Sequence, residues 1–332
     1  MENGFSRRNF LKAGALTILG TIGAVALGQS AQKANAAHSH QDAASMGHSG
    51  GDAMPMTMGE VNHANNGFNP SEILTDFDYG SISTLPTGQT LREYDITVIN
   101  KDIEVAPGIV YPAWTYNGRI PGPTIRCTEG DRLRITLRNG SSHPHSMHFH
   151  GIHSAAMDGV PGTPGMVQPG ETFTYEFDAA PFGLHLYHCH AFPLARHIAK
   201  GLYGAFIIDP QAGRPPVDHE FVMVMSGFDV DFDDVNDFYA VNAIPFHYQL
   251  HPVQIRVGAR VRIYLVNILE YDLINSFHLH ANFFHYYPTG TSLTPSEYTD
   301  NIMQTQAQRG ILEFAYQYPG LYMFHAHNTE FA

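Results

Sequence analysis

Short runs in which every second residue is apolar fill most of the chain from about Leu91 onward, and Gly, Pro and Asn separate them. This period of two predicts β-strands joined by turns. The clearest predicted strands are Tyr94–Ile99, Ile125–Leu137, Thr172–Phe177 and Leu202–Ile208. No long helical periodicity competes with them, so we expect an all-β fold built as antiparallel sandwiches or barrels.

One strand pattern occurs twice. Gly130–Asn139 (GDRLRITLRN) returns as Gly258–Asn267 (GARVRIYLVN). Such a repeat predicts two copies of one β-domain. The Pro-rich stretch Gly213–Pro216 is the natural boundary between the copies, so we expect tandem domains at residues 69–212 and 213–332.

Each copy is followed by two His-x-His pairs, which are His148/His150 and His188/His190 in the first and His278/His280 and His325/His327 in the second. Side chains two positions apart on a strand point the same way, about 6.5–7 Å from each other. One pair therefore suits two neighbouring metal ions, and eight imidazoles suffice for a cluster of three ions. The pairs alone do not name the metal, because imidazole binds copper, zinc and iron.

A cysteine between two of these histidines narrows the choice of metal. Cys189 lies between His188 and His190, so alternation directs its sulfur to the face opposite both imidazoles. His145 and His197 are spaced to meet it, and two histidines with one cysteine are typical of a blue-copper site. The alternatives are a buried apolar thiol and a zinc site, but zinc has no redox chemistry and would leave the cluster without an electron source.

These motifs resemble the multicopper oxidases, and the length resembles the small two-domain laccases of that family, which are related to copper nitrite reductases. The resemblance extends from about Leu91 to the end of the chain. It implies two tandem cupredoxin-like Greek-key β-sandwiches and a homotrimer, with each trinuclear cluster between domain one of one subunit and domain two of the next. It also implies four copper ions per subunit: type 1 at His145, Cys189 and His197; type 2 at His148 and His278; and type 3 at His150, His188 and His327 on one ion and His190, His280 and His325 on the other.

Three positions refine this assignment. In the second repeat Ala326 replaces the cysteine and Asn275 stands in place of His145, so we expect the type 1 site in the first domain only. Leu202 stands where many relatives have an axial methionine. Because a thioether donor stabilises Cu(II), we expect Leu202 to be non-ligating and the type 1 potential to be comparatively high.

The resemblance implies a laccase-like oxidase that draws electrons from a phenol, an aromatic amine or a low-valent metal ion and reduces O2 to water. Asp158 and Glu330 are the candidate proton donors. A copper nitrite reductase is one alternative, but that family has an aspartate at the position of His148 and a non-ligand at that of His190. A copper-sequestering protein is another, although it does not account for eight histidines in register.

The N-terminal residues carry different signals. Residues 1–36 resemble a twin-arginine export signal, with SRRNFLK, an apolar run and Ala34-Asn35-Ala36, and predict a periplasmic or extracellular location. The apolar run is short and broken by glycines, so we expect no stable membrane insertion. Residues 37–68 are predicted to be a flexible linker rich in potential copper ligands, among them His38, His40, His48, His63, Met46, Met54, Met56 and Met58.

Composition excludes some classes of protein. Among 332 residues, 18 Lys and Arg against 31 Asp and Glu give a net charge of −13, which argues against a nucleic-acid partner. Two cysteines against 21 histidines exclude a disulfide framework. The chain ends soon after His327, so we expect the last strand of domain two to be missing. Several histidines remain without a predicted role: His143, His153, His185, His219, His247, His251 and His285.

Overall fold

The computed structural model describes residues 58–328. The predicted export signal and most of the predicted linker therefore lie outside the described residues, as does Glu330. The helices are short: α2 (His63–Asn66), α3 (Pro70–Ile73), the 3-10 helix η1 (Ala155–Met157), α4 (Leu194–Ala199) and α5 (His247–Leu250). No helix among residues 58–328 has the length and hydrophobicity needed to span a membrane.

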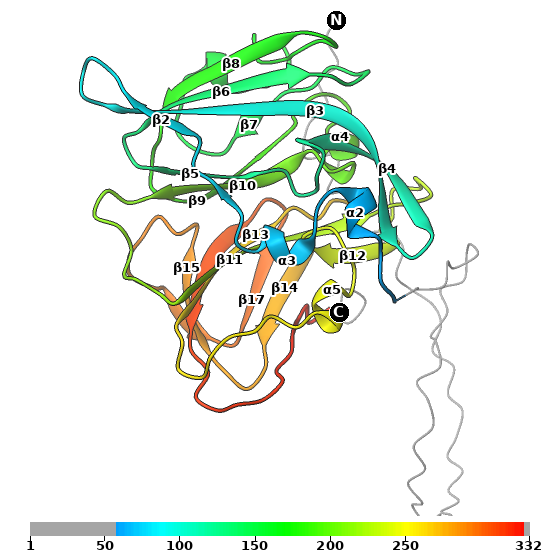
Figure 1. The fold of residues 1–332 in the computed structure, drawn as a ribbon, viewed down its shortest axis with the longest axis vertical. Coiled ribbons are helices and arrows are strands. Elements are labelled where there is room, and N and C mark those ends of the chain that lie inside the picture. Colours follow the sequence, from blue (N-terminus) through cyan, green and yellow to red (C-terminus); the bar gives the residue numbers. More distant parts are fainter. Residues whose placement is uncertain (1–57, 329–332) are drawn as a thin grey trace, which may run out of the picture. The chain divides into compact units, whose positions relative to one another are not determined.

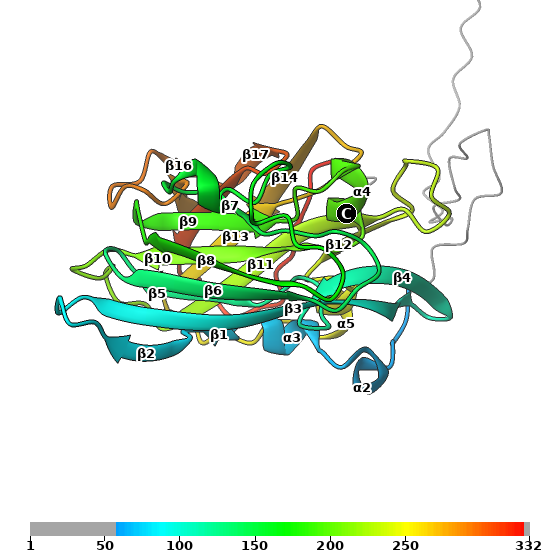
Figure 2. The ribbon, with the colours of Figure 1, turned by 90° about the horizontal axis from the view of Figure 1, so that it is seen from above.

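The first domain is a sandwich of two sheets. One sheet has the spatial order β1 (Phe77–Asp78), β5 (Thr124–Thr128), β10 (Tyr203–Asp209), β9 (Gly183–His188) and β7 (His148–Phe149). The other has the order β2 (Ser81–Thr84), β3 (Thr90–Ala106), β6 (Arg132–Asn139) and β8 (Thr172–Asp178), with β4 (Ile109–Tyr116) paired to β3. Figure 2 shows β3, β6 and β8 side by side.

The second domain is also a sandwich. Its larger sheet has the order β12 (Phe238–Val241), β11 (His219–Phe228), β13 (Val261–Asn267), β18 (Arg309–Phe314), β15 (Phe284–Pro288) and β16 (Glu297–Thr299). Its smaller sheet has the order β17 (Asn301–Thr305), β14 (Ile274–Leu279) and β19 (Phe324–His325).

The repeat in the sequence is a repeat in topology. Strand β6 pairs in parallel with β3 and antiparallel with β8, and its counterpart β13 pairs in parallel with β11 and antiparallel with β18. The register repeats as well, because His148 lies opposite His188 and His278 lies opposite His325. The predicted fold class, two tandem all-β sandwiches of the cupredoxin type, is confirmed.

The predicted strand Ile125–Leu137 is in fact two strands that belong to opposite sheets of the sandwich. They are separated at Gly130, which has a φ of 88° and whose amide donates to the carbonyl of Ala179. Glycine adopts this left-handed conformation without steric cost, so the chain leaves β5 and enters β6 here.

Three apolar cores hold these sheets together. One lies inside each sandwich, and the third joins the two domains. Figure 1 shows the reason: β9 and β10 lie between the β3–β6–β8 sheet and the strands β11 and β13. In β10, Phe206 faces the first sandwich core while Ala205 and Ile207 face the core between the domains. Strands buried on both faces read as continuous apolar runs.

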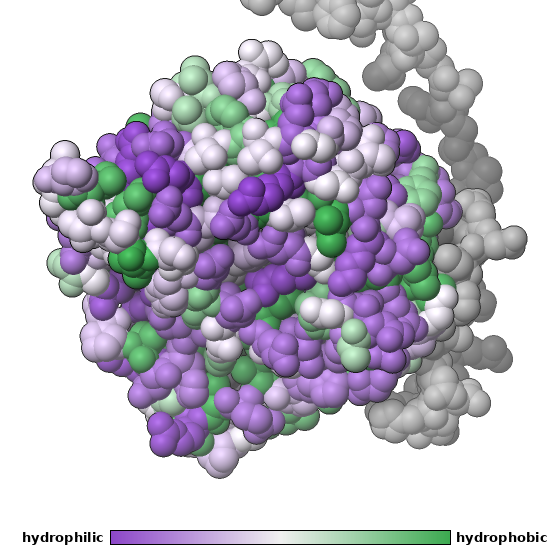
Figure 3. Space-filling view, turned by 45° about the horizontal axis from the view of Figure 1, so that its top comes forward, coloured by the Kyte–Doolittle hydropathy of each residue, from purple (hydrophilic) through white to green (hydrophobic). Residues whose placement is uncertain are grey.

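The surface differs from these cores. On the face seen in Figure 3, hydrophilic residues predominate and hydrophobic residues form small separate patches. The apolar residues of the alternating pattern are therefore mostly buried in the three cores. These cores hold in place the strands that carry the candidate ligands.

The last residues of the predicted linker pack against the folded domains. Val61 and Phe68 are buried in the core between the domains. The side chain of Asn66 pairs with the backbone of Glu104 on β3, at 2.9 Å for both its donor and its acceptor. Two apolar anchors and one buried amide order this segment, and so small a set gives no periodicity that sequence analysis can detect.

Candidate metal centres

His145, Cys189 and His197 converge in the first domain, and all three are buried. His145 Nδ1 lies 3.1 Å from His197 Nδ1, and Cys189 Sγ lies 3.2 Å from His197 Nδ1 and 3.7 Å from His145 Nδ1. A triangle with these sides puts each donor atom about 2 Å from a common centre, close to the bond lengths that first-row metals make to imidazole and thiolate. The predicted His2Cys residues therefore fit one metal ion.

The surroundings of this centre keep the imidazoles neutral. Burial lowers the pKa of His145 to about 3 and that of His197 to about 4, so both offer lone pairs at neutral pH. Burial raises the pKa of Cys189, so the thiolate forms when metal binds. The amide of Ser146 points at Cys189 Sγ from 3.4 Å, and Leu202 is fully buried beside the centre, where it offers no side-chain donor.

Four histidines of the first domain form a second group. The rings of His148, His150, His188 and His190 lie 5.1 to 5.8 Å apart between centroids. His150 Nε2 is 3.2 Å from His188 Nε2. Cys189, between two of these residues, faces the sandwich core, as alternation along the strand predicts.

The second domain holds a matching group. Its rings, those of His278, His280, His325 and His327, lie 4.9 to 5.6 Å apart between centroids. His280 Nε2 is 2.8 Å from His325 Nε2. The amide of His327 donates to Ser276 Oγ just as that of His190 donates to Ser146 Oγ, so the support of the two groups is also repeated.

Backbone carbonyls orient the imidazoles. Nδ1 of His148 donates to the carbonyl of Asp158 at 2.8 Å, and Nδ1 of His278 donates to that of Asp300 at 2.9 Å. His188 and His325 donate in the same way to the carbonyl of the following residue. A bond at Nδ1 fixes the tautomer and leaves the Nε2 lone pair for a metal ion.

Two carboxylates accompany these bonds. Asp158 Oδ1 lies 3.1 Å from His148 Nδ1, beside the group for which Asp158 was a predicted proton donor. Asp300 Oδ2 lies 3.8 Å from His278 Nδ1 and is its counterpart in the second domain. Sequence analysis missed Asp300, because 22 residues separate it from His278 along the chain. The repeat could have indicated it, because in each domain one aspartate lies beside Nδ1 of the first histidine of the group.

The two groups of four histidines are separate within one chain. No ring contact or hydrogen bond joins a histidine of one group to a histidine of the other among residues 58–328. The structure thus brings together four imidazoles in each domain, and it does not bring all eight together.

A cavity of about 540 Å³ opens beside the His2Cys centre. Its lining includes His197 itself and Trp114, whose ring centroid lies 4.6 Å from that of His197. Three cations and one carboxylate also line it, namely Lys101, Arg196, Lys200 and Asp102. This cavity gives a small molecule access to a candidate metal ligand.

Fold and donor atoms together define the class of protein: a copper protein built from two cupredoxin-like domains, since thiolate with imidazole is the donor set of blue copper. Comparison with known proteins then gives the family. Family models described as multicopper oxidase match residues 97–213 and residues 215–332. The chain belongs to the multicopper oxidase family.

Individual relatives agree with this. A multicopper oxidase of known crystal structure shares 61% sequence identity with this chain and matches its structure with a TM-score of 0.81. The match covers 82% of this chain and 96% of that one. A copper nitrite reductase from Nitrosomonas europaea is 28% identical, with a TM-score of 0.66 over 72% of this chain and 90% of that one. The copper-containing nitrite reductase of Neisseria meningitidis serogroup A is 29% identical over 69% of this chain, which spans 64% of that relative's length.

Proposed function

We propose that this protein is a laccase-like oxidase that takes single electrons from a small reductant and passes them to dioxygen, which is reduced to water. When bound, copper supplies the redox chemistry: one type 1 ion at His145, Cys189 and His197 would accept electrons, and three ions at the histidine groups would deliver them to O2. The observation that carries the proposal is that matched groups of four imidazoles occur in both domains, and that Cys189 directly follows β9, between two histidines of the first group.

The chain itself would connect the two kinds of site. Cys189 is bonded through the backbone to His188 and His190, whose rings belong to the first histidine group. Its sulfur faces the opposite side of the strand, so a covalent path of adjacent residues joins the electron-accepting site to the oxygen-reducing site. Asp158 and Asp300 are placed to hold or pass protons at the rims of the two groups.

The cavity beside His197 favours an aromatic reductant. Trp114 offers a ring for stacking, and three cations against one carboxylate make the lining positive. A phenolate or an electron-rich aromatic compound suits that charge, whereas Cu(I), Fe(II) or Mn(II) would be repelled. We therefore propose phenolic and related aromatic substrates ahead of low-valent metal ions.

Nitrite reduction is a weaker candidate despite the nitrite reductase relatives. His148 and His190 stand where the nitrite reductase pattern has an aspartate and a non-ligand. Both side chains point into the first histidine group, with 5.1 Å between their ring centroids. They add donors that one mononuclear copper does not need, and this supports a cluster of several ions.

We propose that three copies assemble head to tail, so that the second-domain group of one subunit completes the first-domain group of the next. Each group alone has only half of the eight imidazoles. The second group is flanked by exposed apolar side chains, with Met303 64%, Met323 60% and Leu321 83% exposed. An exposed apolar rim around half a site is typical of an interface, and a head-to-tail contact that closes gives a ring.

We also propose export by the twin-arginine route to the periplasm or cell exterior, on the pattern SRRNFLK near the N-terminus. Residues 1–36 lie outside the described residues, so this proposal depends on sequence alone. Replacing Arg7 and Arg8 by lysine would test it, since the proposal predicts accumulation of the variant in the cytoplasm.

Copper content, spectra and oxygen uptake test the proposed activity together. We expect about four copper ions per chain, an intense blue absorption band from the thiolate, and one O2 consumed for every four electrons taken from a phenol. A fully loaded protein that holds two copper ions per chain, reduces nitrite and leaves O2 untouched would instead be a nitrite reductase.

A further inference from the structure

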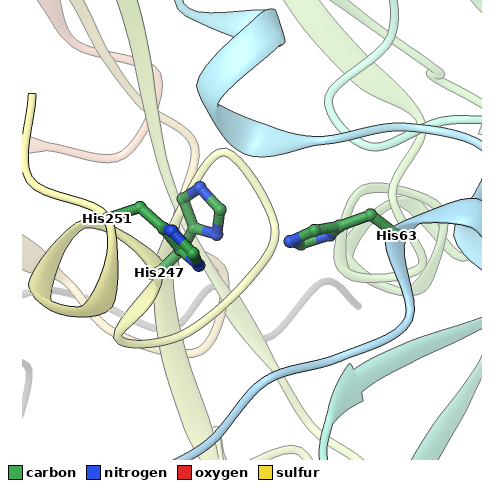
Figure 4. Close-up of side chains that lie close together, drawn as sticks. All are labelled: His63, His247 and His251. Atoms are coloured by element: carbon green, nitrogen blue, oxygen red, sulfur yellow. The ribbon is translucent and has the colours of Figure 1, made fainter.

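A third histidine cluster lies outside the oxidase site. It consists of His63 on α2, His247 on α5 and His251 directly after α5, and the potential ligand atoms of all three lie within 4.8 Å of one another. Figure 4 shows the His63 ring pointing toward the other two from the opposite side. The ring centroid of His247 is 5.1 Å from that of His63 and 4.7 Å from that of His251.

Local backbone geometry explains the pair at α5. The amide of His251 donates to the carbonyl of His247 at 2.8 Å, which is one helical turn. Residues four apart in a helical turn present side chains on one face, so both rings face α2.

The hydrogen bonds leave ligand atoms free toward the centre of the cluster. Ser71 Oγ lies 2.8 Å from His247 Nε2 and fixes that ring, as the second hydrogen bond of a metal-bound histidine does. His63 Nδ1 is buried and has no hydrogen-bond partner within the described part of the chain. A buried polar atom without a partner is costly, and a bound cation would satisfy it.

A carboxylate completes the set of donors. Glu60 Oε1 lies 3.0 Å from His251 Nε2. The side chains of Glu60 and His251 are 63% and 43% exposed, whereas His247 is buried. The cluster is therefore open to solvent on the side of Glu60 and His251 and closed on the side of His247.

We propose that His63, His247 and His251, together with Glu60, bind one divalent transition-metal ion of the Zn(II) or Cu(II) kind, at a site separate from the oxidase copper ions. Three imidazoles and one carboxylate form a four-donor set that both ions accept. Burial, followed by the neighbouring imidazoles, lowers the pKa of His247 to about 4. The His247 ring is therefore neutral at pH 7 and able to bind metal.

The ion would clamp the beginning of the folded chain to the second domain. Helix α2, which carries His63, comes before the first sandwich in the sequence and contacts its strand β3. Helix α5 belongs to the second sandwich, where it follows β12 and precedes β13 along the chain. An ion that binds only the folded form stabilises it, so thermal stability should rise with ion concentration.

The test uses full-length protein loaded with only as much copper as the oxidase site is proposed to hold, about four ions per chain, and adds Zn2+ as the probe. We expect one additional zinc per chain by elemental analysis after gel filtration, an unchanged copper content, and a higher melting temperature. His251→Gln and His63→Gln should each weaken that zinc binding at least tenfold and abolish the rise in melting temperature. Both positions are at least partly exposed, which favours folded variants; circular dichroism checks this.

His285→Gln is the matched control, because His285 is exposed and its ring contacts Tyr298 but no other histidine among residues 58–328. It should bind zinc as the unmodified protein does. Equal zinc binding and equal thermal shift in the unmodified protein, His251→Gln and His63→Gln would overturn the proposal. The copper count in the same samples reports on the oxidase site, so failure of one proposal is distinguishable from failure of the other.

Discussion

Cys189 and its two neighbours along the chain contribute to two different candidate metal sites. Its sulfur lies in the sandwich core with His145 and His197, while the rings of its neighbours His188 and His190 belong to the histidine group on the other side. Sequence spacing predicts this division, because alternation in a strand is a local property. Asp300 and the cluster at His63 are not predicted in this way, since each depends on tertiary contacts between segments far apart in sequence.

Replacing Leu202 by methionine should lower the reduction potential of the type 1 copper proposed at His145, Cys189 and His197. The buried leucine has no donor atom, whereas a thioether there would stabilise Cu(II) relative to Cu(I). The two side chains have similar volumes, so the fold should tolerate the change. Redox titration of the blue absorption band measures the effect, and a potential equal to or above that of the unmodified protein would contradict the assignment of Leu202 to the axial position.

Replacing Asp158 or Asp300 by asparagine should slow oxygen reduction. Each loses a carboxylate near a histidine Nδ1 but keeps the main-chain carbonyl that orients the ring. The loss of a proton donor costs about 100-fold in turnover. Stopped-flow reduction of type 1 copper without oxygen should be unchanged, as should turnover of the surface control Asp95→Asn. If oxygen reduction by both site variants matches that of the control, neither carboxylate moves protons.

At the scale of elements, the repeat and the alternation predict the sandwiches but not where strands divide. The predicted strand Ile125–Leu137 crosses a glycine turn, because apolar alternation continues through Gly130 from one sheet into the other. The continuous apolar run of β10 correctly predicts a strand. It does not reveal that one face of this strand packs in the core between the two domains. A core shared by two domains cannot be assigned from the pattern of one strand.

A polar network also joins the domains at the edge of this core. Arg126 on β5 pairs with Asp209 of its own domain at 2.7 Å and with Glu220 on β11 at 2.8 Å. Arg262 and the hydroxyl of Tyr264 also reach Glu220, at 2.9 and 2.8 Å. Glu220 thus accepts hydrogen bonds from both domains.

Replacing Glu220 by glutamine should destabilise the protein by about 2–4 kcal/mol at pH 7, because Arg126 and Arg262 each lose one of their two carboxylate partners. Burial alone would raise the pKa of Glu220, but hydrogen bonds from Arg126 and its neighbours lower it from 4.5 to about 2. A lowered pKa in the folded state stabilises the protein above the unfolded value, and this contribution is lost as the pH falls from about 4.5 through about 2.

Denaturant unfolding at several pH values measures this effect. The difference between the unmodified protein and Glu220→Gln should shrink as the pH falls across that range. Glu93→Gln is the control, since Glu93 pairs with Arg134 at the surface, where solvent screens the pair, and the change should cost clearly less stability than Glu220→Gln. A Glu220 variant no less stable than the Glu93 variant would show that the network does not join the domains energetically.

At the scale of the whole molecule, one chain holds two separate groups of four imidazoles, and assembly is proposed to bring the group of one copy to that of the next. Sequence predicts the eight histidines, but the arrangement of copies is a property of surfaces that no single strand pattern encodes. Those surfaces carry apolar side chains on β17 and near β19, beside the second histidine group.

Introducing a charge into this rim should dissociate the assembly. Met303→Asp places a carboxylate in the proposed interface, and we expect a smaller species in analytical ultracentrifugation and loss of oxygen uptake. Val110→Asp on β4 is the control, as Val110 is similarly exposed at 58% in the first domain away from that rim. A Met303→Asp protein that remains a trimer with full activity would place the interface elsewhere.

Complementation between two inactive variants tests the shared site most directly. One variant carries His148→Ala and His150→Ala, and the other carries His278→Ala and His280→Ala, so each lacks one half-site. Co-expressed with different tags and purified as mixed trimers, they should regain about a third of normal oxygen uptake, because in each mixed head-to-tail ring one of the three interfaces pairs two intact halves. Mixed trimers that consume no oxygen would contradict the claim that each cluster forms between copies of the chain.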